Sequence, residues 1–91
     1  METIRINNTI LEFNKIIYVD ANNGSDTAGD GSKDNPYKSL NQAHAVAVSG
    51  DCIVLKGVFY LGEGFTFKQD VDYIGYTKDT VLNGSNWIGY N

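Results

Sequence analysis

The sequence contains three informative pieces: Tyr-Val-Asp-Ala-Asn-Asn-Gly-Ser-Asp at 18–26, Pro-Tyr-Lys-Ser-Leu at 36–40 and Gly-Asp-Cys-Ile-Val-Leu-Lys-Gly-Val-Phe-Tyr-Leu at 50–61. In this order they predict a strand end with a Gly/Asp-rich loop, a helix start, and two short strands joined at Gly57. Short strands with turn residues at the corners are typical of a chain wound into stacked coils, a β-solenoid. Such folds need about three repeats to cover their apolar faces, and only residues 52–91 remain to build them. We therefore expect further coils or another subunit to cover the open end.

The composition indicates one small domain. The 91-residue chain is 42% hydrophobic, which is enough for a folded domain with a small core. Its net charge is −4 and its seven Lys and Arg residues are scattered singly, whereas nucleic-acid binding needs them clustered. No apolar stretch is long enough to cross a membrane, and the N-terminus lacks the basic and hydrophobic regions of a secretion signal. We expect neither a nucleic-acid nor a membrane partner, and we do not expect this sequence to direct its own secretion.

The first 15 residues predict a β-hairpin. Two β-rich runs at 3–6 and 9–13 flank Asn7-Asn8, and Asn tolerates the positive φ of a tight hairpin turn. A third strand is expected at 16–19, where β-propensity is high and no helical period is present. We assign residues 1–15 to an N-terminal β segment that serves attachment or oligomerisation, a role inferred from its position.

The loop at 20–36 is rich in Gly, Asp, Asn and Ser. Asx side chains hydrogen-bond their own backbone and Gly supplies positive φ, which favours a series of self-capping turns. Calcium binding is the alternative, because this cation takes several oxygen ligands from flexible loops, and Asp20, Asp26 and Asp30 are the candidate ligands. The EF-hand pattern is not matched. We expect no other metal or cofactor.

A short helix is predicted at 39–49, followed by short strands. Ser39 and Gln42 have the spacing of a capping box, and Gly50 is suited to end the helix. The expected apolar face consists of Leu40, Ala43, Ala47 and, at its edge, Val48. Beyond the helix, we expect strands at 52–56, 58–61, 65–68, 71–76 and 81–82, with a last one beginning at 87.

Four residues could carry nucleophilic or acid–base chemistry. Cys52 is the single cysteine and precedes an apolar run, so we interpret it as a small buried hydrophobe, with a reactive thiol as the alternative. His44 is the single histidine, with no second histidine and no nucleophile motif, so we expect packing or surface exposure, with catalysis as the alternative. Asp70 and Asp72 could act as paired carboxylates, but adjacent acids on a turn are usually solvated. We assign no catalytic residue.

Several motifs together resemble a known family. They are Tyr18-Val19-Asp20, Gly24-Ser25-Asp26, Gly29-Asp30-Gly31-Ser32, Pro36-Tyr37-Lys38-Ser39-Leu40, Gln42-Ala43, Gly50-Asp51-Cys52-Ile53-Val54-Leu55 and Gly57-Val58-Phe59-Tyr60. This pattern resembles the N-terminal cap and first coil of right-handed parallel β-helix proteins of the pectate-lyase-like superfamily, which includes bacteriophage tailspikes. Lys56 departs from it, because the family commonly has Pro before the Gly. The family's catalytic residues match no position of this chain.

The resemblance implies an all-β fold, the start of a right-handed parallel β-helix, with an N-terminal hairpin segment and one short capping helix. Residues 16–51 would form the cap, including the helix at 39–49, and residues 52–91 the first one to two coils. The cap helix would plug the open end of the solenoid, where apolar side chains and unpaired strand edges invite aggregation.

Three functional hypotheses follow from the resemblance. The first is a non-catalytic capping and attachment part of a phage tailspike or tail fibre, located in the virion tail and assembled as a homo-oligomer, with a trimer expected. Its complete protein would bind or degrade a host surface polysaccharide. The second is the cap of a secreted polysaccharide lyase or hydrolase, and the third a structural or adhesive module without catalysis. Trp87, Tyr76 and Tyr90 are candidate contacts to a subunit or to sugar rings, although aromatic residues in such folds more often fill the interior.

Overall fold

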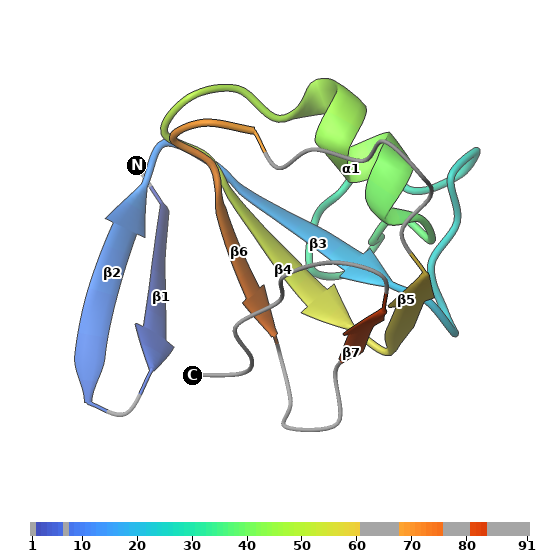
Figure 1. Cartoon of the computed structure of the whole chain (residues 1–91), viewed down its shortest axis with the longest axis horizontal. Coiled ribbons are helices and arrows are strands. Elements are labelled where there is room, and N and C mark those ends of the chain that lie inside the picture. The colour runs from blue at the N-terminus through green and yellow to red at the C-terminus, as the bar shows by residue number, and fades with distance from the viewer. Residues whose placement is uncertain (1, 7, 61–67, 76–80, 84–91) are drawn as a thin grey trace.

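The computed structural model describes residues 2–6, 8–60, 68–75 and 81–83 (Figure 1). Within them, the chain forms seven strands and one helix. In chain order these are β1 (Glu2–Ile6), β2 (Thr9–Phe13), β3 (Ile16–Asp20), α1 (Leu40–Val46), β4 (Cys52–Lys56), β5 (Val58–Tyr60), β6 (Asp72–Gly75) and β7 (Val81–Asn83).

The N-terminal hairpin is confirmed. Strands β1 and β2 pair antiparallel, with Ile6 opposite Thr9. Asn8 in the connecting turn has φ 69°, the left-handed conformation that Asn adopts more readily than most residues. The expected third strand is also present as β3.

The centre of the fold is a three-stranded parallel sheet in the order β3-β4-β6 (Figure 1). Ile16 of β3 is aligned with Cys52 of β4, and Cys52 with Asp72 of β6. A separate two-stranded parallel sheet joins β5 to β7, with Val58 opposite Val81. Parallel neighbours need long connections, and the one between β3 and β4 contains the loop and α1.

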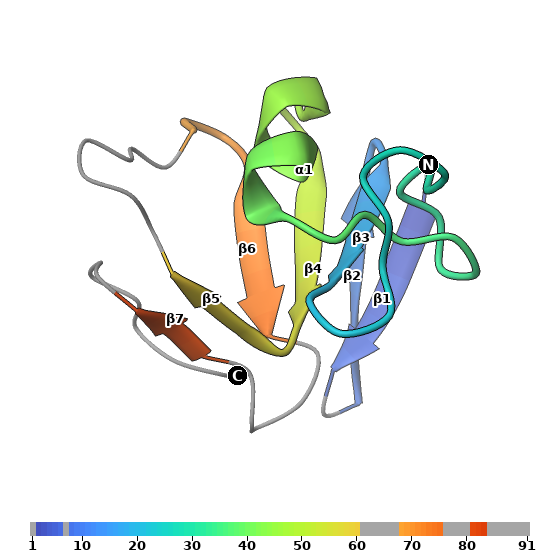
Figure 2. The same cartoon turned by 90° about the vertical axis from the view of Figure 1, so that its right-hand side faces the viewer.

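Strand β4 is buried on both faces because a different element covers each. Successive side chains of a strand point to opposite faces. Ile53 and Leu55 belong to a cluster shared with the helix, whereas Cys52 and Val54 belong to a cluster shared with the hairpin. Figure 1 shows the hairpin and the helix on opposite sides of the sheet, and Figure 2 looks onto the side that α1 crosses.

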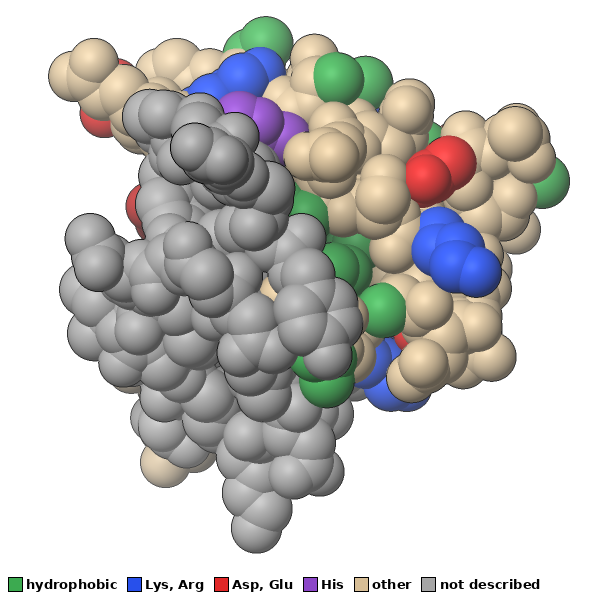
Figure 3. Space-filling model, turned by 45° about the vertical axis from the view of Figure 1, so that its right-hand side comes forward, with side chains coloured by type: hydrophobic (Ala, Val, Ile, Leu, Met, Phe, Trp, Pro, Cys, Tyr) green, Lys and Arg blue, Asp and Glu red, His purple; other side chains and the backbone are tan. Residues whose placement is uncertain are grey.

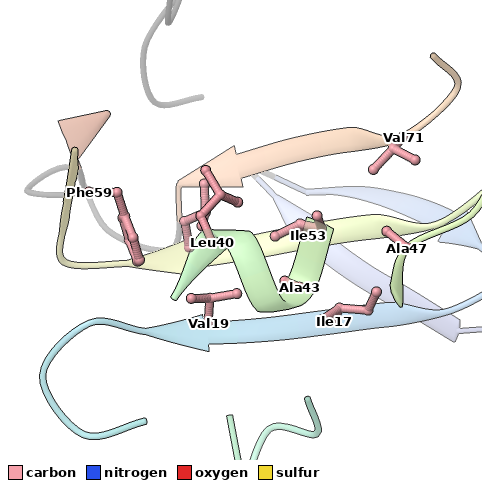
Figure 4. Close-up of a cluster of buried hydrophobic side chains, with 9 residues drawn as sticks. Ile17, Val19, Leu40, Ala43, Ala47, Ile53, Phe59 and Val71 are labelled. Atoms are coloured by element: carbon pink, nitrogen blue, oxygen red, sulfur yellow. The ribbon is translucent and has the colours of Figure 1, made fainter. Parts of the chain in front are cut away.

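The core on the helix side is built from residues far apart in the sequence (Figure 4). Ala43 of α1 is fully buried, and its small size lets the helix lie close to β3 and β4. Ile17 and Ile53 are also fully buried beneath it. Burying an aliphatic side chain of this size contributes about 1.5–3 kcal/mol, so this pair stabilises the core that the helix covers.

The prediction of an all-β, right-handed parallel β-helix is wrong. The described residues combine an antiparallel hairpin, two parallel sheets and a helix, and no solenoid is evident among them. The hairpin occupies one face of the parallel sheet, and α1 packs across the other face instead of plugging the end of a stack. Expected strands that fall within 61–67, and the one beginning at Trp87, lie outside the described residues.

The helix begins as predicted and ends earlier. Ser39 is its N-cap, and its hydroxyl oxygen accepts a hydrogen bond from the backbone N–H of Gln42 at 3.1 Å. The helix stops at Val46 because Ala47 is extended, with ψ 141°. Asp51 then holds the following turn: its Oδ2 accepts from the N–H of Val48, and its own N–H donates to the Val48 carbonyl. Val48 is therefore 64% exposed, and its assignment to the apolar face is wrong.

Candidate functional site

The loop between β3 and α1 is organised by three carboxylates that bind backbone N–H groups. Asp20 Oδ1 accepts from Asn22 and Asn23, and Asp30 Oδ1 accepts from Ser32. Asp26 makes the longest connection, because its Oδ1 accepts from the N–H groups of Lys38 and Ser39, both at 3.0 Å. The prediction of self-capping turns is confirmed at Asp20 and Asp30, and at Asp26 the cap extends to the start of the helix.

These hydrogen bonds favour the ionised carboxylates. Burial pushes the pKa of Asp20 upward, but the N–H groups of Asn23 and Asn22 bring it below its ordinary value. The N–H of Ser39 is the main cause of the lowered pKa of Asp26. The hydroxyl and N–H of Ser32 lower the pKa of Asp30. Each carboxylate is thus charged at neutral pH and serves a different turn.

The three candidate calcium ligands do not form a metal site in the described part of the chain. There, no group of three or more His, Cys, Asp or Glu side chains could hold a metal ion. Asp20, Asp26 and Asp30 are not brought together, since each caps its own segment of backbone. Carboxylates spaced along a loop satisfy the composition of a calcium site without its geometry.

The outer edge of β3 is closed by the N-terminus and by the loop. In a parallel ladder, alternate residues direct their N–H and C=O groups toward the neighbouring strand and away from it. On β3 the groups directed away from β4 belong to Ile16, Tyr18 and Asp20. Their N–H groups donate to Glu2 Oε1, to the Gly31 carbonyl and to the Tyr37 carbonyl, respectively. Tyr37 in turn donates to the Tyr18 carbonyl at 3.0 Å.

Two glycines allow the loop to approach this edge. A Cβ atom on Gly24 would collide with the carbonyl oxygen of Tyr37, and one on Gly29 would collide with that of Pro36. This closed edge was not predicted from the sequence, because most of its hydrogen bonds join backbone atoms. The one sequence signal for it was the pair of glycines that permits close backbone approach.

A hollow of about 130 Å³ lies at the C-terminal ends of β3 and β4. Asp20 and Lys56 are directly opposite each other there, at the ends of their strands. The loop contributes Lys33 and Pro36, and the lining is completed by Tyr18, Val19 and Val54. In open parallel sheets, ligands bind at the C-terminal ends of the strands, so this position is a candidate binding site.

A second hollow, of about 420 Å³, lies beside the start of α1. Ala21, Leu40 and Phe59 line its apolar part, and Asp26 and Lys38 lie at its polar part. Figure 3 shows hydrophobic side chains gathered on one face of the molecule, with acidic and basic side chains beside them. Because Asp26 Oδ1 there accepts the N–H of Ser39, this carboxylate holds the helix start in place.

Cys52 is a structural residue, as predicted. Its side chain is fully buried, and burial, with Asp72 and Asp51 nearby, raises the pKa of the thiol to about 12. A thiol in this state does not form the reactive thiolate at neutral pH.

His44 lies in a small cluster with Tyr73 and Lys68. The His44 and Tyr73 rings are 6.4 Å apart between centroids. The N–H of Lys68 donates to the Tyr73 hydroxyl oxygen, and its Nζ donates to the Ala47 carbonyl. Burial, together with the charge of Lys68, lowers the pKa of His44. This arrangement fits the expected packing role.

The proposed aromatic contacts, Trp87, Tyr76 and Tyr90, lie outside the described residues. Asp70 is described, and its carbonyl accepts the N–H of Gly50 at 2.8 Å, so it belongs to a turn. None of the described helices has the length and apolar character of a membrane span.

Comparison with known proteins gives no relative: no family model, curated protein or solved structure matches the chain.

Proposed function

We propose that this chain is a non-catalytic capping and attachment segment of a bacteriophage tail protein, whose complete form binds or degrades a host surface polysaccharide. The observation that carries the proposal is the closed outer edge of β3, where Glu2, Gly31 and Tyr37 take up the groups that another strand would use. Exposed strand edges pair with other chains, and natural proteins cover them to prevent this. A segment that closes one edge of a sheet is suited to the end of a larger assembly.

Further support comes from the side chains that could otherwise carry chemistry. Asp20 and Asp26 hold backbone N–H groups, and Cys52 is buried with a raised pKa. All three serve the fold, which favours a structural segment over a catalytic one. The location in a virion tail and the homotrimeric assembly rest on the resemblance of the loop, helix-start and strand motifs to tailspike caps, and not on a solenoid.

The capping role can be tested by opening the edge. In the Gly24→Ala variant, the added methyl group collides with the Tyr37 carbonyl and should displace Tyr37 from β3. We expect this variant to form larger species as its concentration rises, measured by light scattering. The matched control is Ala28→Ser, an exposed position in the same loop, which should keep the mass of the parent chain.

A milder variant keeps this test interpretable if Gly24→Ala does not fold. Glu2→Ala frees only the N–H of Ile16 and leaves the loop intact. The capping role is overturned if both folded variants keep the mass of the parent chain at every concentration.

Attachment and absence of catalysis need separate measurements. An antibody against the chain should label isolated phage tails in electron micrographs, and labelling of phage-free host envelopes instead would contradict the tail location. The isolated chain should release no oligosaccharide from host surface polysaccharide. If the chain still releases oligosaccharide after it has been purified to a single species, the non-catalytic role is contradicted.

A further inference from the structure

The hollow at the C-terminal ends of β3 and β4 combines charge with an apolar floor. Lys33 and Lys56 line it together with a single acid, Asp20. Two positive charges thus face one negative charge, in a chain whose net charge is −4. This local reversal of sign attracts an anion to a protein that otherwise repels one.

Asp20 offsets only one of the two lysine charges, and one positive charge remains in surplus. The Asp20 carboxylate lies opposite Lys56, whose charge is among the causes of its lowered pKa, and its Oδ1 also accepts the N–H groups of Asn22 at 2.9 Å and Asn23 at 3.0 Å. Asp20 is only 9% exposed, whereas both lysines are exposed. An entering ligand therefore meets the ammonium groups more readily than the carboxylate.

The floor of the hollow suits the apolar side of a ring. Val54 is buried, and Tyr18 and Pro36 are half-buried, so they present carbon surface without closing the space. The hollow has a volume of about 130 Å³. It is therefore too small for a chain of sugars, and it takes the anionic group and one side of a single small ring.

The walls are held by hydrogen bonds before any ligand arrives. The Asn35 carbonyl accepts the N–H groups of Asp30 and Gly31, which closes the loop that carries Lys33. The Pro36 carbonyl accepts the N–H of Ser25 at 3.0 Å, and Tyr37 is hydrogen-bonded to β3. A preformed site binds without the entropic cost of ordering a loop.

We propose that this hollow binds a small organic anion, a carboxylate or a phosphate carried on a body no larger than one sugar ring. Lys33 and Lys56 hold the anionic group, and the ring lies against Tyr18, Pro36 and Val54. The capping role does not require this site, so either proposal can fail without the other.

The test is a titration of the ¹⁵N-labelled 91-residue chain followed by two-dimensional NMR. The probes are sodium glucuronate and glucose 6-phosphate, with glucose as the neutral control, all at constant ionic strength. We expect saturable shifts of the backbone signals of Asp20, Lys33 and Lys56 with one or both anions and none with glucose. Saturation by only one anion identifies the anionic group that the site prefers.

Variants separate a site from general charge attraction. Lys33→Gln and Lys56→Gln should each weaken binding about tenfold, the effect of losing one charge-assisted hydrogen bond. Lys15→Gln removes an exposed lysine outside the hollow and should leave the affinity unchanged. Lys33 lies in an exposed loop, so its variant remains informative if Lys56→Gln unfolds.

Two results would overturn the proposal. One is the absence of saturation with both anions. The other is an equal loss of affinity in the Lys15→Gln and Lys33→Gln variants, because the anion would then be attracted to positive charge in general.

Discussion

The Oδ1 atom of Asp26 accepts a hydrogen bond from the backbone N–H of Ser39, thirteen positions later, at 3.0 Å. Ser39 is itself the N-cap of α1, and its side chain accepts from Gln42. The loop carboxylate therefore fixes the residue that starts the helix, and the helix covers one face of the parallel sheet. One side chain connects the loop, the helix and the core.

Replacing Asp26 by Ala should lower the free energy of unfolding by about 1 kcal/mol, the usual cost of losing a capping interaction. The substitution leaves the N–H groups of Lys38 and Ser39 without this acceptor. Asp34→Ala is the matched control, because it removes an exposed acid from the same loop. Urea denaturation measures the free energy of unfolding of both variants. An equal loss of this free energy in the two would contradict a capping role for Asp26.

The contribution of Asp26 should disappear in acid. Hydrogen bonds hold its pKa below the ordinary value of 3.8, so the folded state binds fewer protons than the unfolded state in this range. Stability is then present above pH 3.8 and is lost as the pH falls through the lower folded pKa. The difference in unfolding free energy between the wild type and Asp26→Ala should shrink over this interval. A difference that stays constant from about pH 6 down to about pH 2 would show that the charge of Asp26 is not involved.

His44 should make the protein less stable as the pH falls from about 7 to about 5. Burial and Lys68 lower its pKa below 6.5, so the unfolded chain binds the proton more readily than the folded one, and stability rises with pH. His44→Gln should flatten the slope of unfolding free energy against pH in this range. Asn41→His, which adds an exposed histidine to the same helix, should leave the slope of the parent chain unchanged. An unchanged slope in His44→Gln would assign the effect to other groups.

The Cys52 thiol should resist labelling in the folded protein. It is fully buried with a pKa of about 12, so the reactive thiolate is scarce at about pH 8. Ellman's reagent should therefore react slowly with the native chain. The control is the same chain in urea, where the reagent should label one thiol per chain. Rapid labelling without denaturant would contradict the structural interpretation.

Local patterns in the sequence predicted the elements better than their arrangement. The Asn pair indicated the hairpin turn, and the spacing of Ser39 and Gln42 indicated the helix start. The apolar run Cys52–Leu55 was the neglected signal for the arrangement, since a strand without alternation is covered on both faces. The hairpin and the helix provide those two covers, whereas the hairpin was predicted to serve attachment or oligomerisation and the helix to plug the end of a stack.

The candidate site was less accessible to sequence reasoning. The Asx residues of the loop correctly predicted turns, because their hydrogen bonds are local. The edge of β3 depends on Tyr37 and Gly31, whose contributions are backbone atoms and carry no side-chain signature. The hollow joins Lys33 to Lys56, and nothing in their spacing indicates that they meet.

Gly50 offers a test of the stacked turns at the N-terminal ends of the parallel strands. Its carbonyl accepts from Asn14 and its N–H donates to the Asp70 carbonyl, so three turns are joined through it. It has φ 93°, and a Cβ atom would collide with Nδ2 of Asn14. Gly50→Ala should therefore cost more than the roughly 1–2 kcal/mol of left-handed strain alone.

The collision and the strain can be separated with a second substitution. Asn14→Ala removes the side-chain atoms that the methyl group added by Gly50→Ala would strike, while the strained φ remains. In the Asn14→Ala background, the cost of Gly50→Ala measured by urea denaturation should fall to about 1–2 kcal/mol. If the cost is the same in both backgrounds, the end of the Asn14 side chain moves away from the added methyl group without loss, and the strained φ of Gly50 is the whole cost.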